Sequence, residues 1–264
     1  MPPPRLLARS PEDFDSDTFE QTAVALELAS QQNGVEHLAH QHRKGQLILA
    51  LQGAVTCEVS EALWLVPPQH AVWIPGGIAH SCRATGNARI FFLFIEPGAA
   101  AMPDKCCTVA ITPLVREMIR YVAEQDPAAS TDGPTARLIA VLLEQLSHAP
   151  IEQLHLPMSN HPKIRRISDT LIADPGDRTT LRQWADLLAM SERSLARLVE
   201  NTTGLTFGRW RQQLHLMIAL SQLAEGTAVQ NVAGNLGYDS VYVFITMFKM
   251  ALGKSPTQYC SSLR

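Results

Sequence analysis

The sequence lacks a cysteine framework. Its five cysteines are an odd number for 264 residues, and none follows another at the Cys-x-x-Cys spacing of zinc ribbons and thioredoxin-like redox motifs. A signal-peptide pattern is also missing, because no apolar core follows the N-terminal Met-Pro-Pro-Pro-Arg. We therefore expect a protein of the reducing cytoplasm rather than a disulfide-stapled secreted domain.

Long hydrophobic runs are absent as well. The longest strongly apolar run, Ile90 to Ile95, is far shorter than the roughly 20 residues that cross a bilayer, so no membrane partner is expected. A chain of 264 residues, of which 46% are hydrophobic, can form about two globular domains.

Positive charge is scarce over the whole chain. The net charge of −3 argues against nucleic-acid binding if the chain is taken as one body. Residues 161–264, however, carry 12 Lys and Arg against 8 Asp and Glu, whereas residues 1–160 carry 10 against 17. The C-terminal part is thus the part that suits nucleic acid.

Residues 236–259 predict a recognition helix with its turn and exit. Asp239 and Ser240 can cap the N-terminus and Gly253 can adopt the left-handed conformation that ends a helix, which places the helix at about 241–252. The face opposite its core stripe offers groups that suit thymine methyls, base edges and a phosphate: Val241, Tyr242, Ile245, Thr246 and Lys249. The alternative is a helix that is buried on both faces.

A second helix and a tight turn precede this helix. Residues 227–230 have the spacing of a capping box and start an apolar helical pattern, and Gly237 permits a sharp turn after it. Together the two helices predict a helix-turn-helix unit at about 229–252.

The same unit occurs earlier in the chain, where Ala185 precedes Ala233 by 48 residues. Thr180 and Ser191 can cap its two helices, which gives a helix-turn-helix unit at about 181–202. The open face of its second helix carries arginines, suited to guanine edges or phosphates, among polar neighbours: Arg193, Ser194, Arg197 and Glu200. Ordinary solvated surface is the alternative for these arginines.

Residues 207–224 form one long helical pattern between the two units. A stiff spacer of this kind suits two recognition helices that enter successive turns of the DNA major groove, roughly 34 Å apart. A packing helix over residues 162–173 precedes the first unit.

Residues 163–260 resemble the DNA-binding domain of the AraC/XylS family of bacterial transcription regulators. The resemblance rests on Trp184-Ala-Asp-Leu-Leu, Ser191-Glu-Arg-Ser-Leu-Ala-Arg-Leu, Gly204-Leu-Thr-Phe, Ala233-Gly-Asn-Leu-Gly-Tyr-Asp-Ser, Phe244, Phe248-Lys249 and Gly253-Lys-Ser-Pro. It implies that base-facing positions are Arg193, Ala196 and Arg197 in the first unit and Val241, Tyr242, Ile245 and Thr246 in the second. One departure is that Ile245-Thr246 stands where Ser-Arg is common.

Residues 18–110 read as short β-rich runs separated by turn-forming residues. This pattern predicts a small antiparallel barrel of the cupin type. The runs cover residues 23–28, 45–51, 54–59, 63–66, 71–74 and 90–95. Residues 1–17, which are Pro-rich and then acidic, are expected to be disordered.

Three histidines and an amide in this region predict a metal site. Side chains two residues apart on a strand share a face, so His40 and His42 point the same way, and His80 can join them from another strand. The spacing resembles the cupin motifs H-x-H-x3-E-x6-G and P-x-G-x2-H, except that Gln46 replaces the usual Glu. We expect these four residues to hold a divalent transition metal such as Zn, Ni, Co or Fe. The alternative is that the histidines line an effector pocket through hydrogen bonds alone.

Residues 111–149 contain two helical patterns, at 113–124 and 134–148. The second is apolar over most of its circumference, which is expected if it packs on the barrel on one side and on its counterpart in a homodimer on the other. Burial within a single chain is the alternative. Residues 150–161 are expected to form a linker to a C-terminal domain at 162–264.

Together these patterns predict an N-terminal all-β cupin-like barrel with a helical appendage and a C-terminal all-α domain with two helix-turn-helix units. The function predicted is that of a regulator, not an enzyme, which binds double-stranded operator or promoter DNA and responds to a small molecule or metal in the barrel. The rival is a metal-dependent cupin enzyme, a dioxygenase or isomerase, with an appended helical domain; Gln46 and the C-terminal motifs argue against it.

Overall fold

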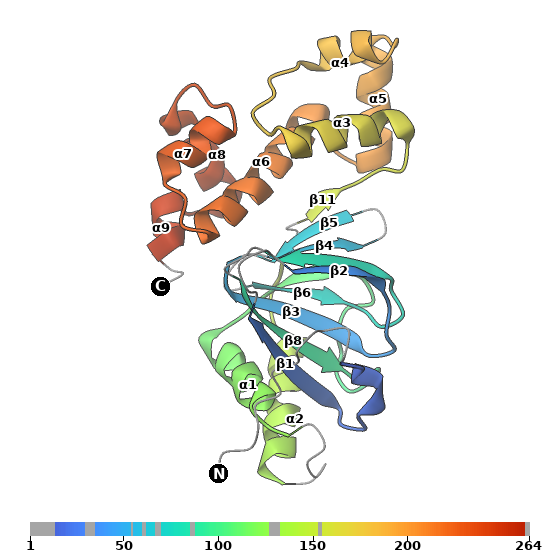
Figure 1. The fold of residues 1–264 in the computed structure, drawn as a ribbon, viewed down its shortest axis with the longest axis vertical. Helices are drawn as coiled ribbons and strands as arrows, with labels where there is room; N and C mark the ends of the chain where they lie inside the picture. Colours follow the sequence, from blue (N-terminus) through green and yellow to red (C-terminus); the bar gives the residue numbers. More distant parts are fainter. Residues whose placement is uncertain are drawn as a thin grey trace. The chain divides into compact units, whose positions relative to one another are not determined.

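The structure is a computed structural model. It describes residues 14–29, 35–53, 55–59, 62–66, 70–84, 88–126, 133–152 and 155–261. The chain divides into two compact units, one made of residues 1–60 and 64–154 and the other of residues 61–63 and 155–264. Figure 1 labels the helices and strands of both units, which are described separately below.

Two antiparallel sheets form the first unit, as the sequence predicts. The larger sheet has the strand order β1-β8-β3-β6-β9-β10. Its strands are β1 (Ala23–Ala29), β3 (Gly45–Gln52), β6 (His70–Ile74), β8 (Arg89–Ile95), β9 (Cys107–Ala110) and β10 (Ile151–Glu152). In the smaller sheet the strands run in the order β5-β4-β7-β2. They are β2 (Val35–His40), β4 (Val55–Val59), β5 (Ala62–Val66) and β7 (His80–Ala84).

Strand alternation separates the two faces of the larger sheet. On β8, Phe91 and Leu93 belong to the core beneath the helices, whereas Phe92 and Phe94 line a cavity on the opposite face. All four are buried, which explains why β8 is an unbroken apolar run rather than an alternating one.

Two helices, α1 (Pro113–Ala123) and α2 (Pro134–Ser147), cover one face of the larger sheet (Figure 1). Four apolar residues of α2 are buried in this core: Ile139, Leu142, Leu143 and Leu146. Burial within the chain therefore accounts for most of the apolar surface of α2. On α1, Leu114 is 56% exposed, whereas Val115 is buried.

The N-terminal segment is more ordered than expected. Residues 1–13 lie outside the described residues, but residues 14–17 contradict the expectation of disorder. The Phe14 ring stacks on Phe19 at 5.3 Å between centroids and lies 5.6 Å from Phe94. A short 3₁₀ helix over Ser16–Thr18 follows, capped by Asp15.

The second unit is helical apart from β11 (His155–Pro157). Its helices are α3 (Pro162–Ala173), α4 (Leu181–Leu187), α5 (Glu192–Thr203), α6 (Phe207–Ala224), α7 (Val229–Asn235), α8 (Val241–Leu252) and α9 (Pro256–Ser261). The bounds predicted for α3, α6 and α8 agree with these. Among the described residues, none of the helices is both long and apolar enough to cross a membrane.

Side-chain caps set most of the N-terminal ends of these helices. Thr180 and Gln183 form a reciprocal capping box at α4, and Ser191 accepts the amide of Ser194 at α5. The capping box predicted at residues 227–230 is wrong, because the N-cap of α7 is Ala228, with no side-chain hydrogen bond. At α8 the cap is Ser240 alone.

The segment expected to be a linker, residues 150–161, is tied to the two units at its described ends. Ile151 and Glu152 pair with β9 in the first unit. In the second unit, Trp210 donates its indole N–H to Pro157 O at 2.8 Å and Gln213 donates to His155 O at 3.2 Å.

Candidate functional site

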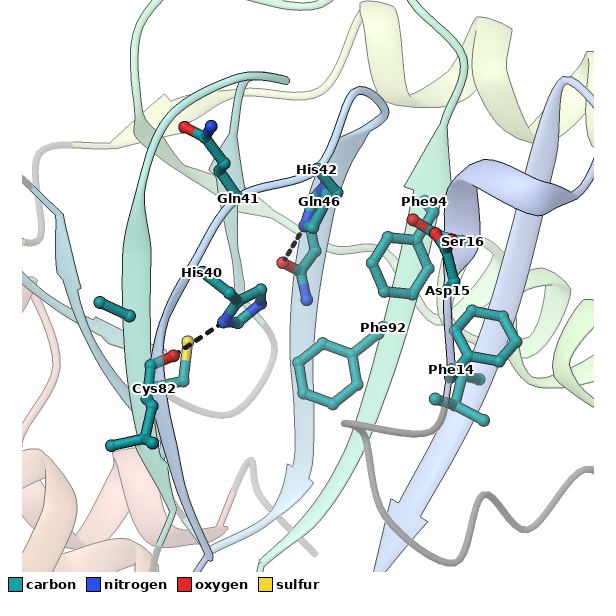
Figure 2. Close-up of a pocket in the computed structure, with 13 residues that line it drawn as sticks. Phe14, Asp15, Ser16, His40, Gln41, His42, Gln46, Cys82, Phe92 and Phe94 are labelled. Carbon is teal, nitrogen blue, oxygen red and sulfur yellow. Dashed lines mark hydrogen bonds between the residues drawn. The ribbon is translucent and has the colours of Figure 1, made fainter.

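A cavity of about 280 Å³ opens in the first unit. Its apolar wall comes from the N-terminal segment and strands of both sheets, and includes Phe14, Leu26, Leu38, Phe92 and Phe94 (Figure 2). The polar part of the lining includes His40, His42, Gln46 and Cys82. Ligand sites commonly combine a largely apolar lining with a few convergent polar groups, which is the arrangement here.

The three predicted histidines converge in the structure. One ring nitrogen each of His40, His42 and His80 lies within 4.8 Å of the other two. Gln46 Oε1 lies 2.9 Å from His42 Nε2 and 2.7 Å from His80 Nε2. The structure thus brings together the four residues that the cupin-like spacing singled out.

The histidines converge from different elements than the sequence predicts. The strand β2 ends at His40, so His42 lies in the turn before β3 and not on the same strand. Gly77 N donates to His42 O at 2.8 Å, and a Cβ on Gly76 would overlap Arg43 O. The turn that precedes His80 is therefore packed against the turn that holds His42, which requires glycine at the contact.

The outer ring nitrogens are oriented by backbone carbonyls. Nδ1 of His40, His42 and His80 lies 2.9, 2.5 and 2.9 Å from the carbonyl oxygens of Leu38, Lys44 and Ile78, respectively. A carbonyl can only accept, so Nδ1 carries the proton and Nε2 of each neutral ring carries a lone pair. Metal-binding histidines are commonly oriented in this way.

The Nε2 atoms of His42 and His80 then lie next to the oxygen of Gln46, although both sides of each contact are hydrogen-bond acceptors and neither supplies a hydrogen. For neutral rings, two arrangements resolve this conflict. A cation between the rings would accept all three lone pairs, or the amide group of Gln46 would be turned over so that its NH₂ donates to both rings. The first arrangement is the metal site that the sequence predicts, and its donor set fits a transition metal. The second is compatible with the alternative, in which the histidines line an effector pocket through hydrogen bonds alone.

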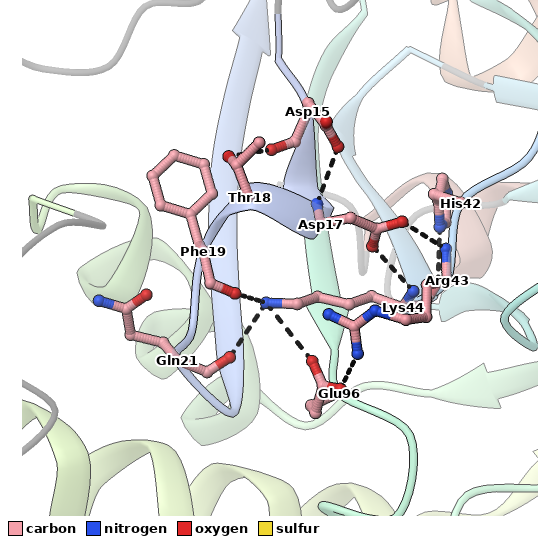
Figure 3. A network of polar contacts seen from close by, with 9 residues as sticks. All are labelled: Asp15, Asp17, Thr18, Phe19, Gln21, His42, Arg43, Lys44 and Glu96. Carbon is pink, nitrogen blue, oxygen red and sulfur yellow. Dashed lines mark hydrogen bonds and ion pairs between the residues drawn. The ribbon is translucent and has the colours of Figure 1, made fainter.

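A buried lysine holds the N-terminal segment at the cavity (Figure 3). Lys44 is fully buried, and its Nζ donates to Phe19 O at 2.6 Å and Gln21 O at 3.1 Å. Burial lowers the pKa of Lys44, and the Arg43 charge lowers it further. The Asp17 carboxylate accepts hydrogen bonds from the backbone N–H groups of Arg43 and Lys44, with N to O distances of 2.6 and 3.1 Å. The turn that carries His42 is therefore fastened to the segment that carries Phe14, an arrangement that the sequence analysis missed.

The first helix-turn-helix unit presents its predicted residues to solvent. Arg193, Ser194 and Arg197 are exposed on α5 and Ala196 is half-buried, whereas Leu195 is buried. Among the described residues neither arginine belongs to an ion pair, so both guanidinium groups are free to bind an external partner.

On α8 the predicted residues form a mixed apolar and polar surface. Tyr242 is 76% exposed, and Thr246 and Lys249 are also exposed, whereas Val241 and Ile245 are half-buried. Two further exposed apolar side chains on this helix were missed by the sequence analysis, Val243 and Met250. Thr246 donates its hydroxyl to Tyr242 O at 2.9 Å, which leaves its methyl group and an oxygen lone pair for a partner.

The turn before α8 is locked to the segment between α3 and α4. The Arg178 guanidinium donates to Gly237 O at 2.5 Å and to Asp239 at 2.6 Å. Asp239 was expected to cap α8, but it forms this ion pair instead. Gly237 has φ 73°, and a Cβ there would lie 2.7 Å from Gly176 O.

Gly237→Ala is expected to destabilise the second unit by about 2 kcal/mol or more and to weaken DNA binding. The left-handed conformation alone costs an alanine about 1–2 kcal/mol, and the contact with Gly176 adds to it. Gly234→Ala is the matched control, because it lies within α7 and no atom lies within 4 Å of its Cβ position. Urea unfolding of both variants measures the difference; equal stabilities would contradict the account of this turn.

A buried histidine makes the second unit sensitive to acid. Burial, together with the Arg211 charge, lowers the pKa of His215 to about 4. Between this value and the ordinary pKa near 6.5 the unfolded chain binds a proton that the folded chain does not, so stability falls as the pH falls. We expect His215 to contribute a loss of about 2 kcal/mol between pH 7.5 and pH 5. Unfolding at both pH values should show that His215→Gln removes this part of the pH dependence and that the exposed-site control His148→Gln does not.

Comparison with known proteins identifies the family. Residues 24–157 match the AraC-like ligand binding domain, and residues 184–262 match a helix-turn-helix domain. Over 250 residues the chain is 50% identical to the HTH-type transcriptional regulator NimR of Escherichia coli (strain K12), a match that covers 95% of this chain and 92% of that relative. The chain belongs to the AraC family of transcriptional regulators. It combines an AraC-like ligand-binding domain with a helix-turn-helix DNA-binding domain, as predicted.

Two more distant similarities extend over both units. The RCS-specific HTH-type transcriptional activator RclR of Escherichia coli (strain K12) is 24% identical over 244 residues, covering 88% of this chain and 74% of that relative. The crystal structure of ToxT from Vibrio cholerae O395 aligns with a TM-score of 0.39 and 11% identity, covering 91% of this chain and 97% of that one.

Proposed function

We propose that the cavity of the first unit is the effector site of this AraC-family regulator, and that its occupation changes the affinity of α5 and α8 for operator DNA. The observation that carries this proposal is the convergence of His40, His42, Gln46 and His80 at a cavity. Three of the four, His40, His42 and Gln46, line that cavity, and its remaining wall is largely apolar. A ligand can change DNA affinity in this way only if it binds the DNA-binding conformation of the protein and the other conformation with different affinities.

A divalent transition metal is the first candidate for the ligand. His40, His42 and His80 would each supply Nε2, and Gln46 would supply an amide oxygen. Neutral nitrogen ligands favour Zn²⁺, Ni²⁺, Co²⁺ or Fe²⁺ over Mg²⁺ and Ca²⁺, which prefer oxygen. A bound metal would draw the three rings together and could also offer a coordination position to a small molecule in the cavity.

We propose a regulatory role for this site and not a catalytic one. A carboxylate ligand, usual in cupin enzymes that the spacing resembles, is replaced by Gln46. The related proteins named above are transcriptional regulators. We also propose that the protein acts in the cytoplasm, because its proposed partner is chromosomal DNA. We propose a homodimer because three apolar side chains of α1 and α2 are exposed: Leu114, Tyr121 and Val141.

The two recognition helices suggest different base preferences. Arg193 and Arg197 of α5 suit the O6 and N7 acceptors of guanine, whereas Val241, Tyr242 and Ile245 of α8 suit thymine methyl groups. Lys249, near the end of α8, suits a phosphate. We therefore expect guanine in the half-site read by α5 and A·T pairs in the half-site read by α8.

Selection of genomic fragments by the purified protein tests this function, with and without added zinc, nickel or cobalt. We expect enrichment of a discrete site whose two parts lie one helical turn apart, and a change in the retained fraction when metal is added. If no sequence is enriched under either condition, sequence-specific binding is contradicted.

A further inference from the structure

Two free cysteines of the first unit face each other across a strand pair. Cys57 of β4 and Cys82 of β7 are register partners, and their Sγ atoms lie 2.8 Å apart. Opposed residues of antiparallel strands have Cα atoms about 4.5–5.5 Å apart, within the range of about 4.4–6.8 Å that a disulfide accepts. A bond between these sulfur atoms therefore requires little backbone movement.

The two thiols differ in their access to the cavity. Cys82 lines the cavity beside His40 (Figure 2), whereas Cys57 is absent from the lining and is fully buried. Burial and the neighbouring Cys82 thiol raise the pKa of Cys57, so Cys57 stays protonated at neutral pH. A small solute that enters the cavity therefore reaches the sulfur of Cys82 first.

We propose that Cys57 and Cys82 form an oxidation site within the cavity, at which a small peroxide such as hydrogen peroxide closes an intramolecular disulfide. The Cys82 sulfur attacks one peroxide oxygen, the O–O bond breaks, and water leaves, which gives a sulfenic acid. The Cys57 sulfur then attacks the Cys82 sulfur, the S–O bond breaks, and a second water leaves with the thiol proton. Two thiols are oxidised by two electrons, and the peroxide is reduced to two waters.

The disulfide would lie close to the histidine cluster. Cys82 follows His80 by two residues on β7, so both side chains lie on the same face of the strand, and both are buried. A cross-link from Cys82 to β4 restricts the strand that positions His80. Oxidation is therefore expected to change the ligand affinity of the cavity; this consequence rests on the proposed effector site, whereas disulfide formation does not.

The test uses the full-length reduced protein, treated with hydrogen peroxide and then alkylated. We expect alkylation to label three of the five cysteines and peptide mapping to show the Cys57–Cys82 cross-link. Cys57→Ser is expected to trap Cys82 as a sulfenic acid that dimedone labels, and Cys82→Ser to leave Cys57 unlabelled. Cys260→Ser, a change outside the cavity, is the matched control and should form the cross-link as the wild-type chain does.

Peptide mapping of the wild-type chain decides the proposal even if a variant fails to fold. Oxidation at Cys106, Cys107 or Cys260 without a Cys57–Cys82 cross-link would overturn it. Equal dimedone labelling of Cys57 in Cys82→Ser and of Cys82 in Cys57→Ser would overturn the assigned order of attack. Because none of these readouts involves DNA, they are independent of the proposed effector function.

Discussion

Replacing Arg193 and Arg197 by alanine is expected to lower operator affinity by about 2–6 kcal/mol, since each bidentate arginine–guanine contact contributes about 1–3 kcal/mol. Both guanidinium groups are exposed on α5 and free of ion pairs among the described residues, so little of the change should arise from lost stability. Titration of a selected operator fragment with the purified single and double variants measures the loss.

The pattern of the loss identifies what each arginine contacts. If Arg193 or Arg197 reads a guanine, its single variant loses preference at that base and retains it elsewhere. If it binds a phosphate, affinity falls equally for all sequences and the salt dependence falls by about one counterion. Arg120→Ala on α1, which removes a surface ion pair with Glu117, is the control and should leave affinity unchanged. Unaltered affinity in the double variant would show that α5 does not enter the groove.

Removal of His80 is expected to lower zinc or nickel affinity by more than about 100-fold. Loss of an outer partner of a metal ligand typically costs 10–100-fold, and loss of the ligand itself should exceed this. His80 is the most buried of the three histidines, and its Nε2 lies 2.7 Å from Gln46 Oε1, so its removal leaves a gap at the centre of the cluster. Calorimetric titration of His80→Ala against the wild-type chain measures the change, with His148→Ala as the exposed-histidine control.

Gln46→Glu separates the two arrangements of this cluster. With a metal, the added carboxylate is an anionic ligand and affinity should rise above that of the wild-type chain. If the cluster binds no metal, the exchange should leave zinc affinity as low as that of the wild-type chain. Equal zinc affinity in the wild-type chain, His80→Ala and Gln46→Glu would contradict the metal proposal.

Much of the helical unit was predictable because its determinants are local. Caps such as Thr180 and Ser191 and the left-handed Gly253 lie within a few residues of the helix ends that they fix, and the bounds of α8 follow from them. The Thr227 prediction failed because capping-box spacing does not show which of two adjacent residues begins the helix, and Ala228 does.

The first unit was less predictable because its determinants are distant in sequence. Strands β2 and β7 carry polar and small residues, such as His40 and Ser81, so neither was among the predicted β-rich runs; strands there were inferred only from the spacing of the histidines. The histidine cluster was found by its spacing, although the turn at His42 was not. The Lys44 contacts and the Cys57–Cys82 pair depend on sheet register and chain packing, for which a single sequence holds no local signal.

The measurement that tests the central claim most directly is the affinity of the full-length protein for a selected operator, in zinc-saturated and chelator-treated form. Coupling between two sites typically changes affinity 5- to 150-fold, so we predict a change of about this size in the wild-type chain and none in His80→Ala. A wild-type chain that binds zinc in the cavity and holds its operator with the same affinity in both forms would contradict the claim that occupation of this cavity controls DNA binding.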